Sequence, residues 1–172
     1  MTKSSALPLP VVLVAGFSQT ARRRVVREAL GRDASRQIAW LDHQDSLLPA
    51  FDTDAASKRQ PTQSFVACVC CAGSLVFTTH LSRLLRHGPW SGLVVSLGAR
   101  AEPARMMSLL SQTPWREHLG PIRLFSVMDE TGRALCEQTQ HALQSLACQQ
   151  RDFAEQVLTS DEGLPANIFA PR

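Results

Sequence analysis

The stretch LPVVLVA at residues 9–15 is apolar, rich in β-branched valine and closed by Gly16. A short apolar run bounded by turn residues is typical of a strand that is buried on both faces. After a turn at residues 17–19, we expect Thr20 to cap a helix over residues 21–30, with Gly31 as its stop. A buried strand that leads directly into a helix indicates the start of an α/β fold.

The same alternation continues along the chain. The pattern predicts further strands at residues 37–41, 64–70, 93–97 and 121–128, and helices at residues 74–87, 103–110 and 132–149. Residues 42–63 are polar and aperiodic and predict a long loop. The tail contains one short apolar piece at residues 153–158. We therefore expect a single α/β domain over residues 1–172, with a mainly parallel sheet of about five to six strands flanked by helices.

Composition excludes several classes of protein. With 44% hydrophobic and 19% charged residues, the chain of 172 residues can bury a core and is not a disordered tail. No apolar run approaches the roughly 20 residues that span a bilayer, and the N-terminus lacks the pattern of an export signal. We expect a cytoplasmic protein without a membrane partner. Five cysteines in that setting favour a metal or thiol site over a disulfide scaffold.

The turn after the first strand stands where many proteins hold phosphate. A working loop reads G-x-x-x-x-G-K-[ST], in which the lysine meets the phosphates and the hydroxyl holds magnesium. This chain keeps the first glycine as Gly16, but it has Ala21, Arg22 and Arg23 in place of the second glycine, the lysine and the hydroxyl. A planar guanidinium does not replace lysine inside a closed loop. The sequence predicts a degenerate phosphate loop formed by Gly16, Arg22 and Arg23, without nucleotide hydrolysis.

Basic residues are otherwise concentrated on the helix that follows this turn. Of the 18 basic residues only Lys3 and Lys58 are lysine. Arg22 to Arg24, Arg27 and Arg32 fit either a solvated helix face or a basic patch for nucleic acid. Because no aromatic residues are interleaved and the net charge is only +3, nucleic acid is the less favoured partner.

Three cysteines cluster in the run Cys68-Val69-Cys70-Cys71. Cys68 and Cys70 share one face of the expected strand, and the turn at residues 72–73 can bring Cys71 beside them. Zinc favours tetrahedral thiolate and imidazole ligation, and Cu(I) accepts three thiolates. The alternative is three small apolar side chains in a buried strand. Candidates for a fourth ligand, among which the sequence does not choose, are His43, Asp42 and His80.

The two remaining cysteines, Cys136 and Cys148, stand apart on the helix expected at residues 132–149. Asp129 precedes this helix, and we interpret it as a helix cap.

Taken together, the strand that ends in Gly-Phe and the C-V-C-C run before a leucine-rich helix resemble the CobW-type family of P-loop GTPases. These proteins are zinc and cobalt metallochaperones, in which the first strand runs into G-F-x-G-x-G-K-T-T and the metal motif is G-C-x-C-C. The resemblance covers roughly residues 10–129 and is most specific over residues 64–85. It implies a P-loop NTPase-like fold and zinc bound by Cys68, Cys70 and Cys71.

The chain departs from the family pattern wherever nucleotide chemistry is concerned. Besides the phosphate loop, residues 95–99 replace the family's E-x-T-G, and no lysine follows Lys58 to complete N-K-x-D. The family's C-terminal domain has no counterpart before Arg172. The resemblance thus implies a CobW-like zinc-binding protein in which GTP and magnesium are lost, working with a partner protein or a client metalloprotein. Rival hypotheses are a GTPase with an unorthodox loop and an interaction scaffold that binds neither ligand.

Overall fold

The stretch that decides the fold, β1 (Leu9–Gly16), lies near the centre of a six-stranded sheet with the order β3-β2-β4-β1-β5-β6. The computed structural model describes residues 8–32, 36–43, 63–66, 74–137, 144–159 and 161–169. Every neighbouring pair of strands in the sheet is parallel. The predicted α/β fold, a parallel sheet flanked by helices in a P-loop NTPase-like arrangement, is confirmed. The other strands are β2 (Ile38–His43), β3 (Gln63–Val66), β4 (Gly92–Ser96), β5 (Leu119–Met128) and β6 (Gln156–Thr159).

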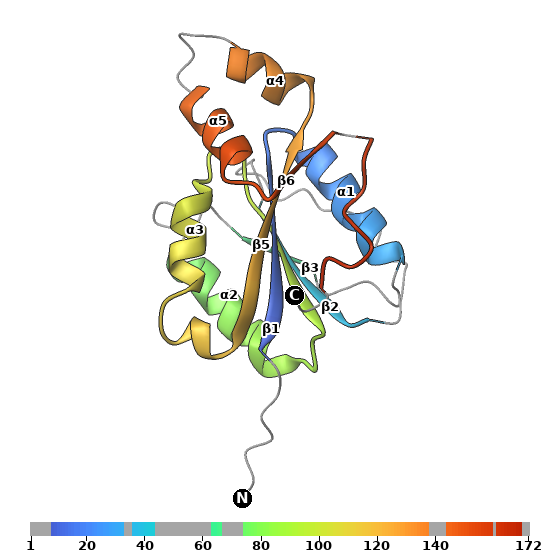
Figure 1. The fold of residues 1–172 in the computed structure, drawn as a ribbon. Coiled ribbons are helices and arrows are strands. Elements are labelled where there is room, and N and C mark those ends of the chain that lie inside the picture. Colours follow the sequence, from blue (N-terminus) through green and yellow to red (C-terminus); the bar gives the residue numbers. More distant parts are fainter. Residues whose placement is uncertain are drawn as a thin grey trace, which may run out of the picture.

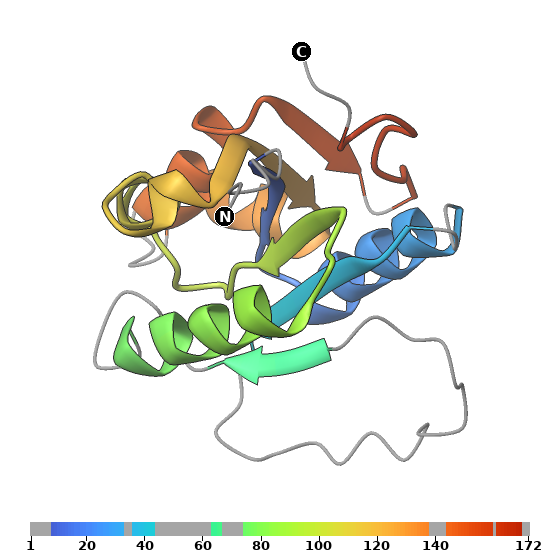
Figure 2. The same cartoon turned by 90° about the horizontal axis from the view of Figure 1, so that it is seen from below.

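Helices cover both faces of the sheet (Figures 1 and 2). α1 (Gln19–Arg32) and residues 161–169 lie on one face, and α2 (Ser74–His87) and α3 (Pro103–Leu110) lie on the other. β1 alternates between these layers, since Val12 and Val14 pack on the α1 side while Val11 and Leu13 pack on the α2 side. α4 (Glu130–Glu137) and α5 (Gln144–Asp152) pack together near the carboxyl end of β5, and a short 3-10 helix spans Trp115–Glu117. No helix in the described ranges is long and apolar enough to cross a membrane.

The start of α1 differs from the prediction. The helix begins at Gln19 and the Ala21 N–H donates to Ser18 Oγ at 3.2 Å, so the cap is Ser18 and the prediction of Thr20 is wrong. Gly31 lies inside the helix. β2 also extends past the predicted end to His43. Asp42 and His43, which the sequence placed in a loop, are therefore strand residues, because strand pairing with β3 and β4 outweighs their polarity.

The last third of the chain holds a second difference. The long helix predicted for residues 132–149 is wrong, because the described parts of this region form two helices, α4 and α5, that pack against each other. Two short amphipathic helices in succession give the same apolar periodicity in the sequence as one long helix does. The prediction of Asp129 as a cap is confirmed, since the Gly132 N–H donates to Asp129 Oδ1 at 2.9 Å. The apolar piece at residues 153–158 contributes the edge strand β6.

Candidate functional site

The predicted phosphate loop lies where β1 ends, at the carboxyl edge of the parallel sheet. This edge is the usual position of ligand sites in open α/β folds. Gly16 has a φ of +147°, and a Cβ atom on it would lie 2.5 Å from the Val127 carbonyl oxygen of β5. Only glycine accommodates both the conformation and this close approach. The first glycine of the loop is therefore required by the packing of β1 on β5.

Arg22 points back into the turn that precedes it. The side chain is 0% exposed, and its Nη1 donates a hydrogen bond to the Gly16 carbonyl oxygen. Its stem lies against Gly16 as well, because a Cβ atom there would be 3.4 Å from Arg22 Cγ. The structure thus brings Gly16 and Arg22 together, as the phosphate-loop alignment requires. The alternative in which Arg22 belongs to a solvated helix face is wrong.

Arg23 is tied to the next strand of the sheet. Its Nε lies 2.6 Å from Asp42 Oδ2, and the Asp42 side chain is fully buried. A second side-chain contact joins β2 to its other neighbour, because Trp40 Nε1 of β2 donates a hydrogen bond to Ser96 Oγ of β4 at 2.9 Å. A buried carboxylate requires a cation partner, and Arg23 supplies it. The guanidinium at the position expected for a magnesium-binding hydroxyl is therefore part of an ion pair.

One N–H group in the first turn of α1 is engaged by a side chain of the protein itself. The Ala21 N–H donates to Ser18 Oγ, and the Arg22 N–H donates to the Ser18 carbonyl oxygen at 3.0 Å. Free N–H groups at a helix start are what usually hold an anion. The Ser18 hydroxyl engages one of these donors, the Ala21 N–H, while the Arg22 N–H makes the first regular hydrogen bond of the helix.

A second buried side chain holds the loop that follows β4. Gln150 of α5 is 1% exposed, and its Nε2 lies within hydrogen-bond distance of three carbonyl oxygens in that loop. The distances are 3.5 Å to Gly98, 3.1 Å to Ala99 and 3.1 Å to Ala101. The sequence analysis did not identify Gln150, because its partners lie about fifty positions away and no local pattern marks them. This glutamine fixes the loop at residues 98–101 that follows β4.

Other arginines of α1 hold the chain's own C-terminal segment. Arg24 Nη2 lies 3.0 Å from Asp161 Oδ1, and Arg32 Nη1 donates to the Leu164 carbonyl oxygen at 2.7 Å. From β5, Arg123 donates to the Ile168 carbonyl oxygen at 3.3 Å. These contacts hold residues 161–169 against the face of the sheet that α1 also covers (Figure 1).

The predicted metal ligands Cys68, Cys70 and Cys71 lie outside the described residues, as does most of the loop at residues 42–63. Within the part of the chain that the structure describes, no three His, Cys, Asp or Glu side chains gather as a metal site would need. The candidates for a fourth ligand are placed differently. Asp42 is engaged by Arg23, whereas His43 pairs in register with Val66 at the end of β3, and His80 is half-buried on α2.

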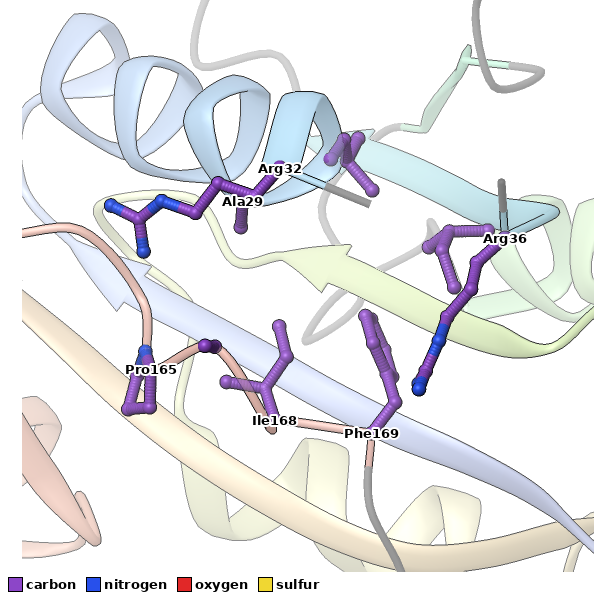
Figure 3. A pocket seen from close by; sticks show the side chains of 9 residues that line it. Ala29, Arg32, Arg36, Pro165, Ile168 and Phe169 are labelled. Carbon is purple, nitrogen blue, oxygen red and sulfur yellow. The ribbon is translucent and has the colours of Figure 1, made fainter. Parts of the chain in front are cut away.

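A cavity of about 170 Å³ lies at the opposite edge of the sheet, between the end of α1, the start of β2 and the C-terminal segment (Figure 3). Arg32 and Arg36 flank it, and Ile168 and Phe169 form part of its apolar lining. Ligand pockets for small molecules usually measure roughly 300–1,000 Å³. This cavity is too small for a nucleotide and is not continuous with the turn at Gly16.

Comparison with known proteins adds no identification: no family model, curated protein or solved structure matches this chain.

Proposed function

We propose that this chain is a CobW-like zinc-binding protein that works without a nucleotide, with Cys68, Cys70 and Cys71 as the thiolate ligands. In this proposal the protein acts in the cytoplasm and passes its metal to a client metalloprotein or receives it from a partner. The observation that carries the proposal is the inward Arg22, which turns a phosphate loop into a closed turn. With the phosphate loop lost, the three thiols of Cys68, Cys70 and Cys71 are the groups that this proposal assigns to ligand binding.

Three contacts argue against a nucleotide at this turn. The Arg22 guanidinium is buried against Gly16 and donates to its carbonyl oxygen, so it does not reach outward as a phosphate-binding lysine does. The Ser18 hydroxyl already accepts a hydrogen bond from the Ala21 N–H in the first turn of α1. Arg23 and Asp42 neutralise each other at the place where magnesium chemistry would need an anionic ligand. These residues do not fit a bound nucleoside triphosphate.

The chain topology supports a metal site at the carboxyl edge of the sheet, where β2 and β3 end. β3 and β2 run parallel, and Val66, the last residue of β3, is in register with His43. The C-V-C-C run begins two residues after Val66. Since Asp42 is already held by Arg23, His43 is the stronger candidate for the fourth ligand. Three thiolates and one imidazole form a common tetrahedral zinc site.

Metal content tests this proposal directly. The full chain is purified under reducing conditions, and its zinc is measured together with the thiolate-to-metal charge-transfer bands of the cobalt-substituted form. We expect about one metal ion per chain, and less than about 0.2 ions in a Cys68→Ser, Cys70→Ser, Cys71→Ser variant. A Cys136→Ser, Cys148→Ser variant is the matched control and keeps its metal. A wild-type chain without metal, or equal metal in both variants, rules out the proposed site.

A further inference from the structure

The cavity between α1, β2 and the C-terminal segment combines an apolar interior with two cationic side chains. Its most buried lining residues are Ile38 and Ile168, each 4% exposed. Half-buried apolar residues complete the interior, namely Ala29, Leu30, Pro165 and Phe169. Arg32, Arg36 and Ala166 line it as well and are exposed, so the cavity is reached from solvent past the two arginines. Among the described residues that line the cavity, none is acidic.

The two arginines have different positions in the cavity. Arg32 Nη1 donates to the Leu164 carbonyl oxygen at 2.7 Å, and a Cβ atom on Gly163 would collide with the same guanidinium. Arg32 therefore holds the C-terminal segment that forms one wall. Figure 3 shows the Arg36 side chain at the opposite end, extending towards Phe169. Because a guanidinium has five N–H donors, Arg36 can bind an anion in addition to its contacts within the chain.

The volume of the cavity sets the size of a ligand. At about 170 Å³ it is smaller than the usual pocket for a drug-sized molecule. A cavity of about 150 Å³ that is lined by Leu, Ile and Phe side chains holds benzene, however. The cavity thus accommodates an apolar body of one ring or of about six carbon atoms. A planar carboxylate is the anion that pairs with a guanidinium through two parallel hydrogen bonds.

We propose that this cavity binds a small monocarboxylate with an apolar body. The body packs against Ile38, Ile168 and Phe169, and the carboxylate pairs with Arg36 at the exposed end. Such a ligand contacts α1 and β2 on one side and residues 165–169 on the other, so it joins the C-terminal segment to the rest of the fold. The site is separate from the turn at Gly16, and the proposal does not depend on zinc.

An NMR titration of the wild-type chain with benzoate tests the site. Benzoate has one ring and one carboxylate, whereas benzyl alcohol has the ring without the charge and acetate has the charge without the ring. We expect saturable shift changes around Ala29, Ile38 and residues 164–169, with a benzoate Kd of about 1 mM or lower. Benzyl alcohol and acetate should each bind about fivefold more weakly or worse.

Three variants separate the charge from the apolar interior. Arg36→Gln should weaken benzoate binding about fivefold or more and leave benzyl alcohol unchanged. Arg27→Gln removes the same charge from an exposed position of α1 that does not line the cavity, and it should bind benzoate as the wild type does. Ala29→Leu fills the interior and should abolish benzoate binding.

Several results would overturn the proposal. They are the absence of saturable shifts in the wild-type chain, shifts centred on residues 16–22, equal binding of benzoate and benzyl alcohol, or equal benzoate binding by the Arg36→Gln and Arg27→Gln variants. Since the first three of these come from the wild-type protein, the test does not depend on how the variants fold.

Discussion

Arg22 determines what the turn after β1 can do. A lysine at this position would end in a flexible point charge that can reach a phosphate, whereas the planar guanidinium is buried and bound to Gly16. The sequence predicted that Arg22 replaces the phosphate-binding lysine. It could not predict the inward orientation, which depends on the space between β1, β5 and α1.

Replacement of Arg22 tests its role in packing. We expect Arg22→Ala to lower the free energy of unfolding by about 2–4 kcal/mol, because it leaves a cavity and an unsatisfied Gly16 carbonyl. Arg24→Ala is the control on the same helix, and its half-exposed ion pairs predict a change within about 0.5 kcal/mol. Urea denaturation measures both variants. Equal stabilities would contradict the buried position of Arg22.

Gly16, which precedes α1, and Gly31, which lies in the last turn of α1, form a matched pair of glycines. Gly16→Ala places a Cβ atom 2.5 Å from the Val127 carbonyl oxygen at a φ of +147°, so we expect a loss of about 3 kcal/mol or more. At Gly31 nothing lies within 4 Å of such an atom, and Gly31→Ala should stabilise the helix by about 0.5–1 kcal/mol. Thermal unfolding shows both changes. A tolerated Gly16→Ala would argue against the close contact of β1 and β5.

At the scale of elements, local signals predicted most of the helices and strands. The limits of α2 and α3 are as predicted, because Gly88-Pro89 and Pro103 mark them directly in the sequence. The division between α4 and α5 and the edge strand β6 were not predicted. Both depend on contacts with distant elements, since β6 is a strand only where it pairs with β5.

The hydrogen bonds of the Gln150 amide lead to a prediction for the loop after β4. Gln150→Ala removes the hydrogen bonds to three carbonyl oxygens, and we expect a loss of about 1–3 kcal/mol in stability with faster amide exchange at residues 98–101. Gln149→Ala is the neighbouring control, because the Gln149 amide donates to the Ser145 hydroxyl at 3.3 Å in an exposed position. Unchanged exchange in the Gln150 variant would show that the loop does not need this residue.

The titration of Cys136 reports on the contact between α4 and α5. Burial raises the pKa of the Cys136 thiol, the hydrogen bond and charge of Cys148 raise it further, and Arg151 opposes them while Asp152 adds a smaller increase. Cys148→Ala should therefore lower the pKa of Cys136, and Arg151→Gln should raise it. Because the thiolate is the reacting form, the midpoint of the alkylation rate against pH moves to lower pH in the first variant and to higher pH in the second. Midpoints that do not move would contradict the contact.

At the scale of the whole molecule, alternating strands and helices predicted the α/β class and the parallel sheet. The strand order could not be predicted, because it depends on which apolar faces pack together over long distances in the chain. The ion pair of Arg23 with Asp42 and the fastening of residues 161–169 by Arg24 and Arg32 arise in the same way. The sequence identified the residue types of the candidate site, but the positions of these residues depend on how distant elements pack.

The central claim is that the affinity of the chain for zinc does not depend on whether a nucleotide is present. In a protein whose nucleotide state gates metal binding, either ligand changes the affinity of the other by the same factor. The most direct test is a calorimetric titration of zinc into the reduced full-length chain, with and without saturating GTP and magnesium. We predict the same zinc Kd within about twofold in both titrations. A shift of about tenfold or more, which is 1.4 kcal/mol of coupling, would contradict the account, as would the absence of zinc binding.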